Sequence, residues 1–362
     1  MPNFNIENGV LRKYTGRKPH VVIPEGITQI DENAFIRCDS MISIVIPEGV
    51  TTIGNSAFWG CSNLSSVTLP QSLREIGDRA FESCASLTSI IIPAGITRIG
   101  YRTFLSCKNL TYVTVPDGVT DIGDSAFCGC ESLASITLPG SLRLIGPTAF
   151  AGCEKLTSTI IPDGVTHIGK SAFKNCKSLT SLVLPDSVTS VMDFAFYECE
   201  SLASVIVSAG MAEIRASVFD HCTGLTSAVI PEGVERIGEC AFDSCKSLTS
   251  VKLPHSIVEI EKKAFTNCSG LTSFTVPYST VVIGEGAFHA CKNLVSVDIE
   301  PGVQAIDVQA FEYCPRLTSV VIPHTVVRIE EDAFDHSPNV TVVCDENNDG
   351  RTRPFIYRYC SV

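Results

Sequence analysis

Residues 64–87 read LSSVTLPQSLREIGDRAFESCASL, and this stretch holds every position of a motif that recurs along the chain. The motif is L-x-x-V-x-L-P-x-x-L-x-x-I-G-x-x-A-F-x-x-C-x-x-L. Its phenylalanine returns every 23 residues without an insertion. Fourteen of the 18 phenylalanines occupy this column: Phe35, Phe58, Phe81, Phe104, Phe127, Phe150, Phe173, Phe196, Phe219, Phe242, Phe265, Phe288, Phe311 and Phe334. A fixed period of this length indicates a stack of equivalent coils.

Each coil is expected to contain one β-strand. Leu64, Val67 and Leu69 match the leucine-rich repeat template, in which alternate strand residues face inward. Pro70 ends the strand because it has no N–H to donate to a ladder. The sequence therefore predicts an α/β repeat solenoid. This is a right-handed leucine-rich repeat coil with a parallel β-sheet on its concave face and short helical or irregular turns on its convex face.

The array is expected to fill nearly the whole chain. Residues 23–343 hold fourteen repeats of 23 residues, and terminal coils need caps because one of their sides is not covered. Residues 1–22 contain Asn8-Gly9 between short apolar runs, which predicts an N-terminal capping hairpin. Residues 344–362 lose the period and are expected to form a C-terminal cap or tail.

Charge and hydropathy exclude some partners. The net charge of −12 repels a phosphate backbone, so no nucleic-acid partner is expected. No apolar stretch is long enough to span a bilayer, so membrane insertion is not expected either. The opening MPNFNIENGV lacks the features of a secretory signal. The expected location is the cell surface or the exterior if a signal was trimmed, and otherwise the cytoplasm.

The cysteines form a second column. Thirteen of the 17 share one register, and Ser337 takes its fourteenth place. Each thiol in such a ladder has two equivalent neighbours, which favours buried thiols acting as small hydrophobic groups over disulfides. Cys128 and Cys240 fall outside this register and are candidates for reactive thiols. Cys344 and Cys360, in the tail, are candidates for a disulfide with each other.

The motif resembles that of the BspA-like (Treponema pallidum-type) leucine-rich repeat family. The resemblance rests on IPEGVTTIGNSAFWGCSNLSSVTLP (46–70) and IPDGVTHIGKSAFKNCKSLTSLVLP (161–185), and it covers about residues 23–343. The opening NGVLRKYTG (8–16) also looks like the N-terminal segment of that family. The resemblance implies a surface protein that takes part in adhesion to host matrix proteins, coaggregation or immune recognition. It implies no catalytic residues.

The outward side of the predicted sheet carries the candidate ligand-binding residues. Four apolar residues follow one another in a column that should face water: Ile160, Val183, Ile206 and Val229. Exposed apolar patches often mark interaction sites, although β-branched residues also favour strands for their own sake. The neighbouring outward column is almost uniformly serine, and Tyr112 interrupts it. We therefore predict a binding face that contains these four residues and Tyr112.

No metal, cofactor or catalytic site is expected. Asp345, Asn347 and Asp349 match the first half of a calcium-binding EF-hand loop, but Ile356 replaces its final glutamate, which favours a polar turn over calcium. His221 adjoins Cys222, which belongs to the core column, so a Cys–His dyad is not expected. His255 and His324 share a column but stand three coils apart.

The sequence thus favours a non-enzymatic binding scaffold, of the surface or secreted adhesion type, that holds a protein or glycan on its concave face. A host extracellular matrix protein is one candidate ligand. Two alternatives stay open. The first is an intracellular protein-interaction scaffold, which the abundance of cysteine without a signal would fit. The second is a passive spacer that presents another domain.

Overall fold

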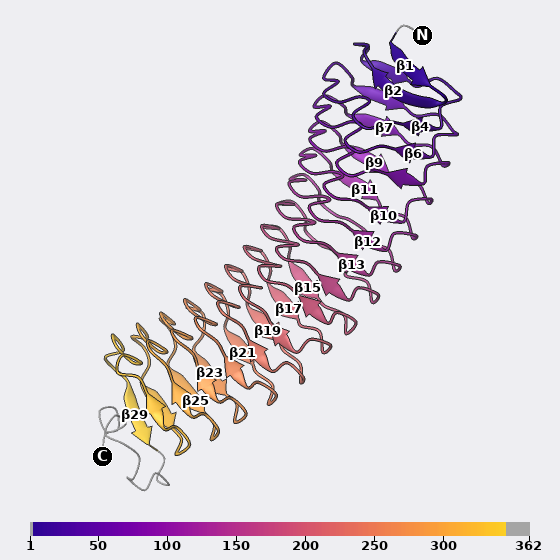
Figure 1. The fold of residues 1–362 in the computed structure, drawn as a ribbon. Coiled ribbons are helices and arrows are strands. Elements are labelled where there is room, and N and C mark those ends of the chain that lie inside the picture. Colours follow the sequence, from indigo (N-terminus) through magenta and orange to yellow (C-terminus); the bar gives the residue numbers. More distant parts are fainter. Residues whose placement is uncertain (1–2, 345–362) are drawn as a thin grey trace. The chain divides into compact units, whose positions relative to one another are not determined.

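A computed structural model describes residues 3–344 of the chain. These residues form a parallel β-solenoid made of 23-residue coils (Figure 1). The chain divides into two compact units, Met1–Leu179 and Thr180–Val362.

The first unit begins with an antiparallel hairpin of β1 (Phe4–Glu7) and β2 (Val10–Tyr14). Its coils then alternate a longer and a shorter strand. The longer strands pair in the order β11-β9-β7-β5-β3. They are β3 (His20–Val22), β5 (Ser43–Val45), β7 (Ser66–Thr68), β9 (Ser89–Ile91) and β11 (Tyr112–Thr114). The shorter strands are β4 (Gln29–Ile30), β6 (Thr52–Ile53), β8 (Glu75–Ile76), β10 (Arg98–Ile99), β12 (Asp121–Ile122), β13 (Leu144–Ile145) and β14 (His167–Ile168).

The second unit repeats this arrangement. Its longer strands form the sheets β15-β17-β19-β21 and β23-β25-β27-β29, and its shorter strands from β18 to β28 form a third. The longer strands are β15 (Ser181–Val183), β17 (Ser204–Ile206), β19 (Ser227–Val229), β21 (Ser250–Lys252), β23 (Ser273–Val276), β25 (Ser296–Ile299), β27 (Ser319–Ile322) and β29 (Thr341–Cys344). The shorter strands are β16 (Ser190–Val191), β18 (Glu213–Ile214), β20 (Arg236–Ile237), β22 (Glu259–Ile260), β24 (Val282–Ile283), β26 (Ala305–Ile306) and β28 (Arg328–Ile329).

The strand register follows the repeat, because each residue pairs with the residue one period away, as Ser204 does with Ser227. The phenylalanine column therefore forms a buried aromatic spine in each unit. Ring centroids lie 5.1 Å apart for Phe58 and Phe81, with planes 3° apart, and 5.3 Å apart for Phe242 and Phe265. This confirms the predicted stacking. Offset stacking at this distance adds to the stabilisation from burial alone.

The turns that follow the shorter strands are irregular, and no helix occurs in residues 3–344. The prediction offered helical or irregular turns; for this part of the chain the α/β class and the helical turns are wrong, and the turns are irregular. The reason lies in the backbone on both sides of the spine, where Arg79 and Ser83 adopt left-handed conformations with φ of 59° and 61°. A right-handed helix cannot continue through such residues. Phe81 N instead donates to Thr103 O of the next coil, at 2.9 Å.

The cysteine column is explained by a hydrogen bond. Cys84 Sγ donates to Phe58 O, and Cys107 Sγ to Phe81 O, each across 3.2 Å and one coil. Ser337, in the fourteenth place, makes the same bond to Phe311 O at 2.8 Å. The column therefore requires a small buried donor, which a thiol or a hydroxyl supplies. Cys84 and Cys107 form no disulfide, as predicted.

Candidate ligand-binding surface

The outward side of the sheet β15-β17-β19-β21 carries three of the predicted binding residues. In each of β15, β17 and β19 the middle side chain is buried and the outer two point to solvent. Val183, Ile206 and Val229 are thereby 58%, 46% and 56% exposed. Strand pairing places them in direct register, Val183 opposite Ile206 and Ile206 opposite Val229. We call these three residues the apolar row.

Polar residues border the apolar row on two sides. Ser181, Ser204 and Ser227 form a parallel row on the same strands, two residues earlier in each. The next strand, β21, continues the two rows with Ser250 and Lys252, and Lys252 lies opposite Val229. Strands stand about 4.8 Å apart, so the apolar row extends over roughly 10 Å.

The first unit holds the two other predicted residues. Tyr112 begins β11 opposite Ser89 and is 55% exposed, and its hydroxyl accepts a hydrogen bond from Thr114 Oγ1 at 3.2 Å. Ile160 is 84% exposed and lies outside the named strands, where an isolated bridge joins Ser135 and Ser158. Of the five predicted residues, only Val183, Ile206 and Val229 share one sheet. The binding role of all five stays a prediction.

The cysteines set aside as candidate nucleophiles are poor ones in this structure. Burial raises the pKa of the Cys128 thiol, and it raises the pKa of Cys240 to about 11, so both are mainly protonated near neutral pH. Cys222 is buried and donates to Phe196 O, while the neighbouring His221 places its Nδ1 2.6 Å from Asp220 Oδ1. The His221 imidazole is therefore bound to the Asp220 carboxylate and not to the Cys222 thiol, so His221 and Cys222 form no dyad.

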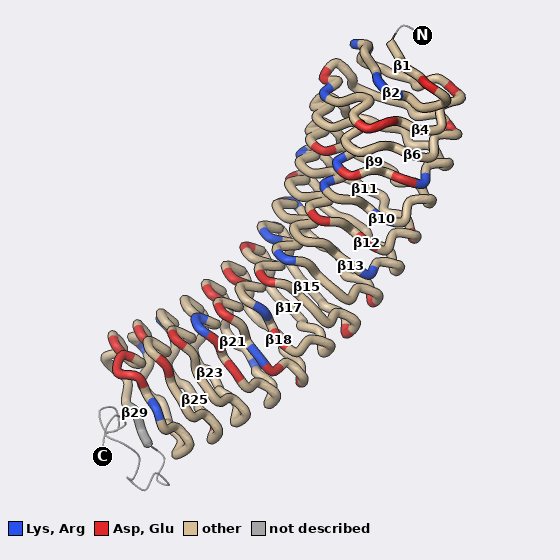
Figure 2. Tube along the Cα trace, in the orientation of Figure 1, with Lys and Arg blue, Asp and Glu red and all other residues tan. Residues whose placement is uncertain are grey.

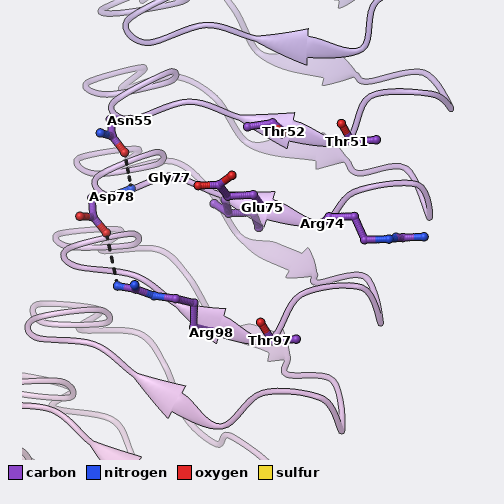
Figure 3. A pocket seen from close by; sticks show the side chains of 10 residues that line it. Thr51, Thr52, Asn55, Arg74, Glu75, Gly77, Asp78, Thr97 and Arg98 are labelled. Carbon is purple, nitrogen blue, oxygen red and sulfur yellow. Dashed lines mark hydrogen bonds and ion pairs between the residues drawn. The ribbon is translucent and has the colours of Figure 1, made fainter.

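An open groove of about 550 Å³ lies over the shorter strands of the first unit (Figure 3). Its polar side chains hold neighbouring coils together. Asn55 Oδ1 accepts from Asp78 N at 2.9 Å, and Asp78 Oδ1 accepts from Tyr101 N at 2.9 Å. Arg98 approaches the same carboxylate at 3.9 Å. Asn55 Oδ1 and Asp78 Oδ1 are thereby engaged within the fold.

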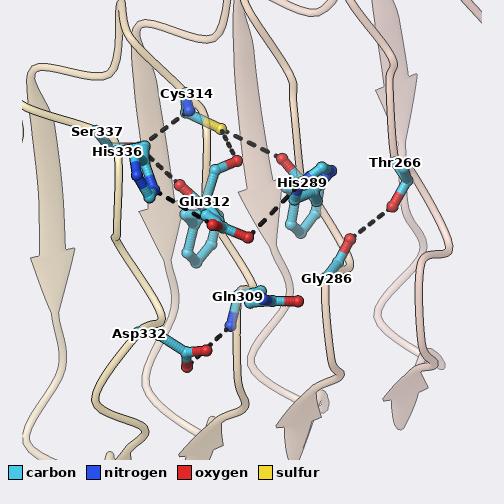
Figure 4. Close-up of polar contacts among 11 residues, drawn as sticks. Thr266, Gly286, His289, Gln309, Glu312, Cys314, Asp332, His336 and Ser337 are labelled. Atoms are coloured by element: carbon cyan, nitrogen blue, oxygen red, sulfur yellow. Dashed lines mark hydrogen bonds and ion pairs between the residues drawn. The ribbon is translucent and has the colours of Figure 1, made fainter.

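A histidine cluster in the second unit was not predicted from the sequence. The carboxylate of the buried Glu312 lies 3.5 Å from His289 Nε2 and 3.3 Å from His336 Nδ1 (Figure 4). The ring of Tyr313 stacks on His336 at 4.4 Å. The repeat period could have predicted this cluster, because His289 and Glu312 are 23 residues apart, and so are Tyr313 and His336. Within residues 3–344 this cluster and the other acidic, histidine and cysteine side chains form no three-ligand metal site.

Two earlier predictions fall partly or wholly outside the described residues: the tail residues Asp345, Asn347 and Asp349, and the pairing of Cys344 with Cys360. Helices capable of spanning a membrane are absent from the part of the chain that the structure describes.

Comparison with known proteins places the fold in a family. The family model for the BspA type leucine rich repeat region, which comprises six copies of the repeat, matches residues 6–134, 97–226 and 212–341. The chain is similar to the crystal structure of a leucine-rich repeat protein from Bacteroides ovatus, with 28% identity, 95% of this chain and 97% of that chain covered, and a TM-score of 0.78.

A leucine rich cell surface protein from Faecalibacterium prausnitzii is also 28% identical, with 99% and 94% of the chains covered and a TM-score of 0.52. The pneumococcal vaccine antigen PcpA shares the fold at 18% identity, with 96% and 98% covered and a TM-score of 0.54. No curated protein matches this chain. The family matches together span residues 6–341, and the chain therefore belongs to the BspA-type leucine-rich repeat family.

Proposed function

We propose that this protein is a non-enzymatic binding module of the surface or secreted adhesion type, whose protein ligand docks on the apolar row. The observation that carries the proposal is the exposure of Val183, Ile206 and Val229 in consecutive register. Solvent-exposed strand positions usually mix polar with apolar residues, and contiguous apolar ones mark interaction sites. The similarity to a cell surface protein of Faecalibacterium prausnitzii supports the location.

The chemistry of the apolar row favours a protein ligand over a glycan. Sugars are held by aromatic faces and convergent hydrogen-bonding groups, whereas the apolar row offers three aliphatic side chains beside small hydroxyls. Aliphatic contacts that exclude water at the centre of a polar rim are typical of protein interfaces. The rigid strand pairing also lowers the entropy lost on binding, because the three side chains are already held in place.

The test is the double substitution Val183→Asp/Ile206→Asp, measured against a panel of immobilised, purified extracellular matrix proteins by surface plasmon resonance. A charge at the centre of an apolar contact should weaken binding at least about 30-fold, which corresponds to one hot spot. Because both side chains point to solvent, the melting temperature should stay nearly unchanged.

The matched control is Val45→Asp/Ile91→Asp, which makes the same change at the same column of the first unit, where both side chains are exposed. It should leave the affinity unchanged. Equal affinity of Val183→Asp/Ile206→Asp and the native protein would refute the apolar row as the site. Failure of every matrix protein to bind the native chain would favour the intracellular scaffold or the spacer.

A further inference from the structure

The longer-strand sheet of the first unit ends at β3 with one edge open. The sheet order places β3 last, with β5 as its neighbour on one side. At the opposite end the sheet does not stop at β11, because an isolated bridge links Thr114 to Thr137. No strand within residues 3–344 pairs with the second side of β3.

The hydrogen bonds of β3 show which backbone groups the open edge presents. Pro19 O accepts from Ser43 N at 3.0 Å, and Ile23 N donates to Val45 O at 3.1 Å. Along a strand these groups alternate between the two sides, so the N–H and C=O groups of His20 and Val22 point away from β5. Such a row of unpaired groups is a template for another strand.

The N-terminal hairpin covers the core of the first coil and leaves this edge open. β2 pairs with β4 in the other sheet, and the ring of Tyr14 lies 5.2 Å from that of Phe35. Val21, whose side chain points inward from β3, is accordingly buried, whereas Val22 is 67% exposed on the outward face. The hairpin therefore extends the shorter-strand sheet by two strands, β2 and β1, but does not extend the longer-strand sheet.

Positive charge is concentrated beside the open edge. The chain has a net charge of −12, yet residues 1–22 contain four basic residues and one acidic residue. Arg12 is paired with Asp31 at 2.7 Å, but Arg17 and Lys18, which directly precede β3, are exposed and form no ion pair with the described residues. Figure 2 shows Lys and Arg in blue at the N-terminal end of this unit.

We infer that the β3 edge binds an extended acidic segment of a partner protein, which adds to the sheet as a further strand. Main-chain hydrogen bonds to His20 and Val22 would provide affinity, as in other cases of strand addition. Acidic residues of the partner would lie against Arg17 and Lys18, and a β-branched residue would pack beside the exposed Val22. Two copies of β3 fit each other less well, since both edges are flanked by the same basic residues, Arg17 and Lys18, and neither edge offers acidic residues to them.

The test uses a fluorescein-labelled peptide of sequence DEESVTVT and measures fluorescence anisotropy with the intact protein. Binding should weaken as salt rises, and a peptide with KKK in place of DEE should not bind. Two further peptides carry N-methyl groups on alternate residues of the SVTVT segment, in one phase or the other. Strand addition requires that one phase abolish binding and the other leave it, because only alternate N–H groups face β3.

Two protein variants complete the test. Arg17→Glu/Lys18→Glu should weaken peptide binding at least tenfold, while Lys292→Glu, an exposed cation in the second unit, should not. Val22→Pro should abolish binding by removing an edge N–H. If this variant misfolds, the comparison of the two N-methylated peptides on the native protein still tests strand addition.

Equal binding of both N-methyl phases would overturn the inference. The inference would also be overturned if the native protein did not bind the peptide and the Arg17→Glu/Lys18→Glu variant self-associated in sedimentation. The role of the two cations would then be only to prevent the edge from pairing with other copies of the chain.

Discussion

The two units differ most clearly at the column that directly follows the last residue of each shorter strand. In the first unit this column is Asp31 followed by six glycines: Gly54, Gly77, Gly100, Gly123, Gly146 and Gly169. In the second unit it is mostly occupied by larger side chains: Met192, Arg215, Gly238, Glu261, Gly284, Asp307 and Glu330. The backbone role is the same in both, since Gly77 N donates to Ile53 O at 2.8 Å and Glu261 N to Ile237 O at 2.9 Å.

Lack of space against the neighbouring coil explains the glycines of the first unit except Gly100, whose added Cβ would meet only the side chains of Asp78 and Thr103. A Cβ added to Gly77 would lie 2.6 Å from Asn55 N, and one added to Gly54 would lie 2.6 Å from Glu32 N. Both contacts are with backbone, which cannot rotate away. Neither glycine has a positive φ, so the requirement comes from the neighbouring coil and not from backbone conformation.

Ion pairs replace the glycines where the column carries a charge. Arg215 Nε lies 3.1 Å from Asp193 Oδ1, Glu261 pairs with Arg236 at 3.5 Å, and Asp307 pairs with Arg328 at 2.7 Å. Asp31, the exception in the first unit, follows the same rule through Arg12. The same ladder of backbone hydrogen bonds is therefore compatible with two kinds of residue at this column: a glycine in close contact with the neighbouring coil, or a charged side chain in an ion pair. The aromatic and thiol columns, by contrast, are common to both units.

The largest effect should come from a feature that the units share, the buried thiols. Burial raises the pKa of Cys107 and of Cys314 to about 12, against about 8.5–9 in an unfolded chain. The folded pKa is the higher one, so the stabilisation is complete below about pH 8.5 and is lost as pH rises toward about 12. Each such thiol should remove about 1–2 kcal/mol of unfolding free energy at about pH 10.

Raised pKa values are found among the ladder thiols of both units, including Cys61, Cys84, Cys107, Cys130 and Cys153 in the first, and Cys222, Cys245, Cys268, Cys291 and Cys314 in the second. Both units should therefore lose several kcal/mol together. Urea titrations with reductant at about pH 8 and 10 would follow the fluorescence of Trp59, the single tryptophan, for the first unit and circular dichroism for both. A midpoint that does not move between these pH values would contradict the prediction.

The aromatic spine gives the next effect, again equal in the two units. Phe81→Ala and Phe265→Ala each remove a fully buried ring stacked on both neighbours. Each should lower the unfolding free energy by about 3–5 kcal/mol, measured by urea denaturation at neutral pH. Val321→Ala, which shortens an exposed side chain, serves as the control. A loss confined to one of the two variants would show that the units do not share one core architecture.

The sequence predicted what is strictly periodic. The 23-residue interval was enough to place Phe81 in a spine, to bury Cys84 and to point Val183 and Ile206 outward, because burial in a stack follows from register alone. It could not decide between the helical and the irregular turns that it allowed, because neither Arg79 nor Ser83 is a residue type that indicates a left-handed conformation. It also missed the His289–Glu312–His336 cluster, since ion pairs between coils depend on which rare side chains happen to share a column.

The glycine column should then separate the units directly. Gly77→Ala places a Cβ against the backbone of Asn55 and should cost about 1–3 kcal/mol, as overpacking does. Glu261→Ala, at the same column in the second unit, keeps a Cβ that the coil already accommodates and should cost less than about 1 kcal/mol. Urea denaturation of both variants provides the measurement. Equal losses would mean that the glycines reflect chance and not space between coils.

The smallest effect tests whether the ion pairs at this column of the second unit contribute to stability at all. Arg215→Ala breaks the pairs with Asp193 at 3.1 Å and Glu213 at 3.4 Å, but all three side chains are partly exposed. Solvent and salt screen such pairs, so the loss should stay below about 1 kcal/mol and shrink further in high salt. Arg215→Gly adds the conformational freedom of glycine and should cost about 0.5–1 kcal/mol more. If Arg215→Gly instead stabilised the protein, this coil would accept the close contact that Gly238 and Gly284 already make in the second unit, and the ion pairs of Arg215 would not be needed for stability.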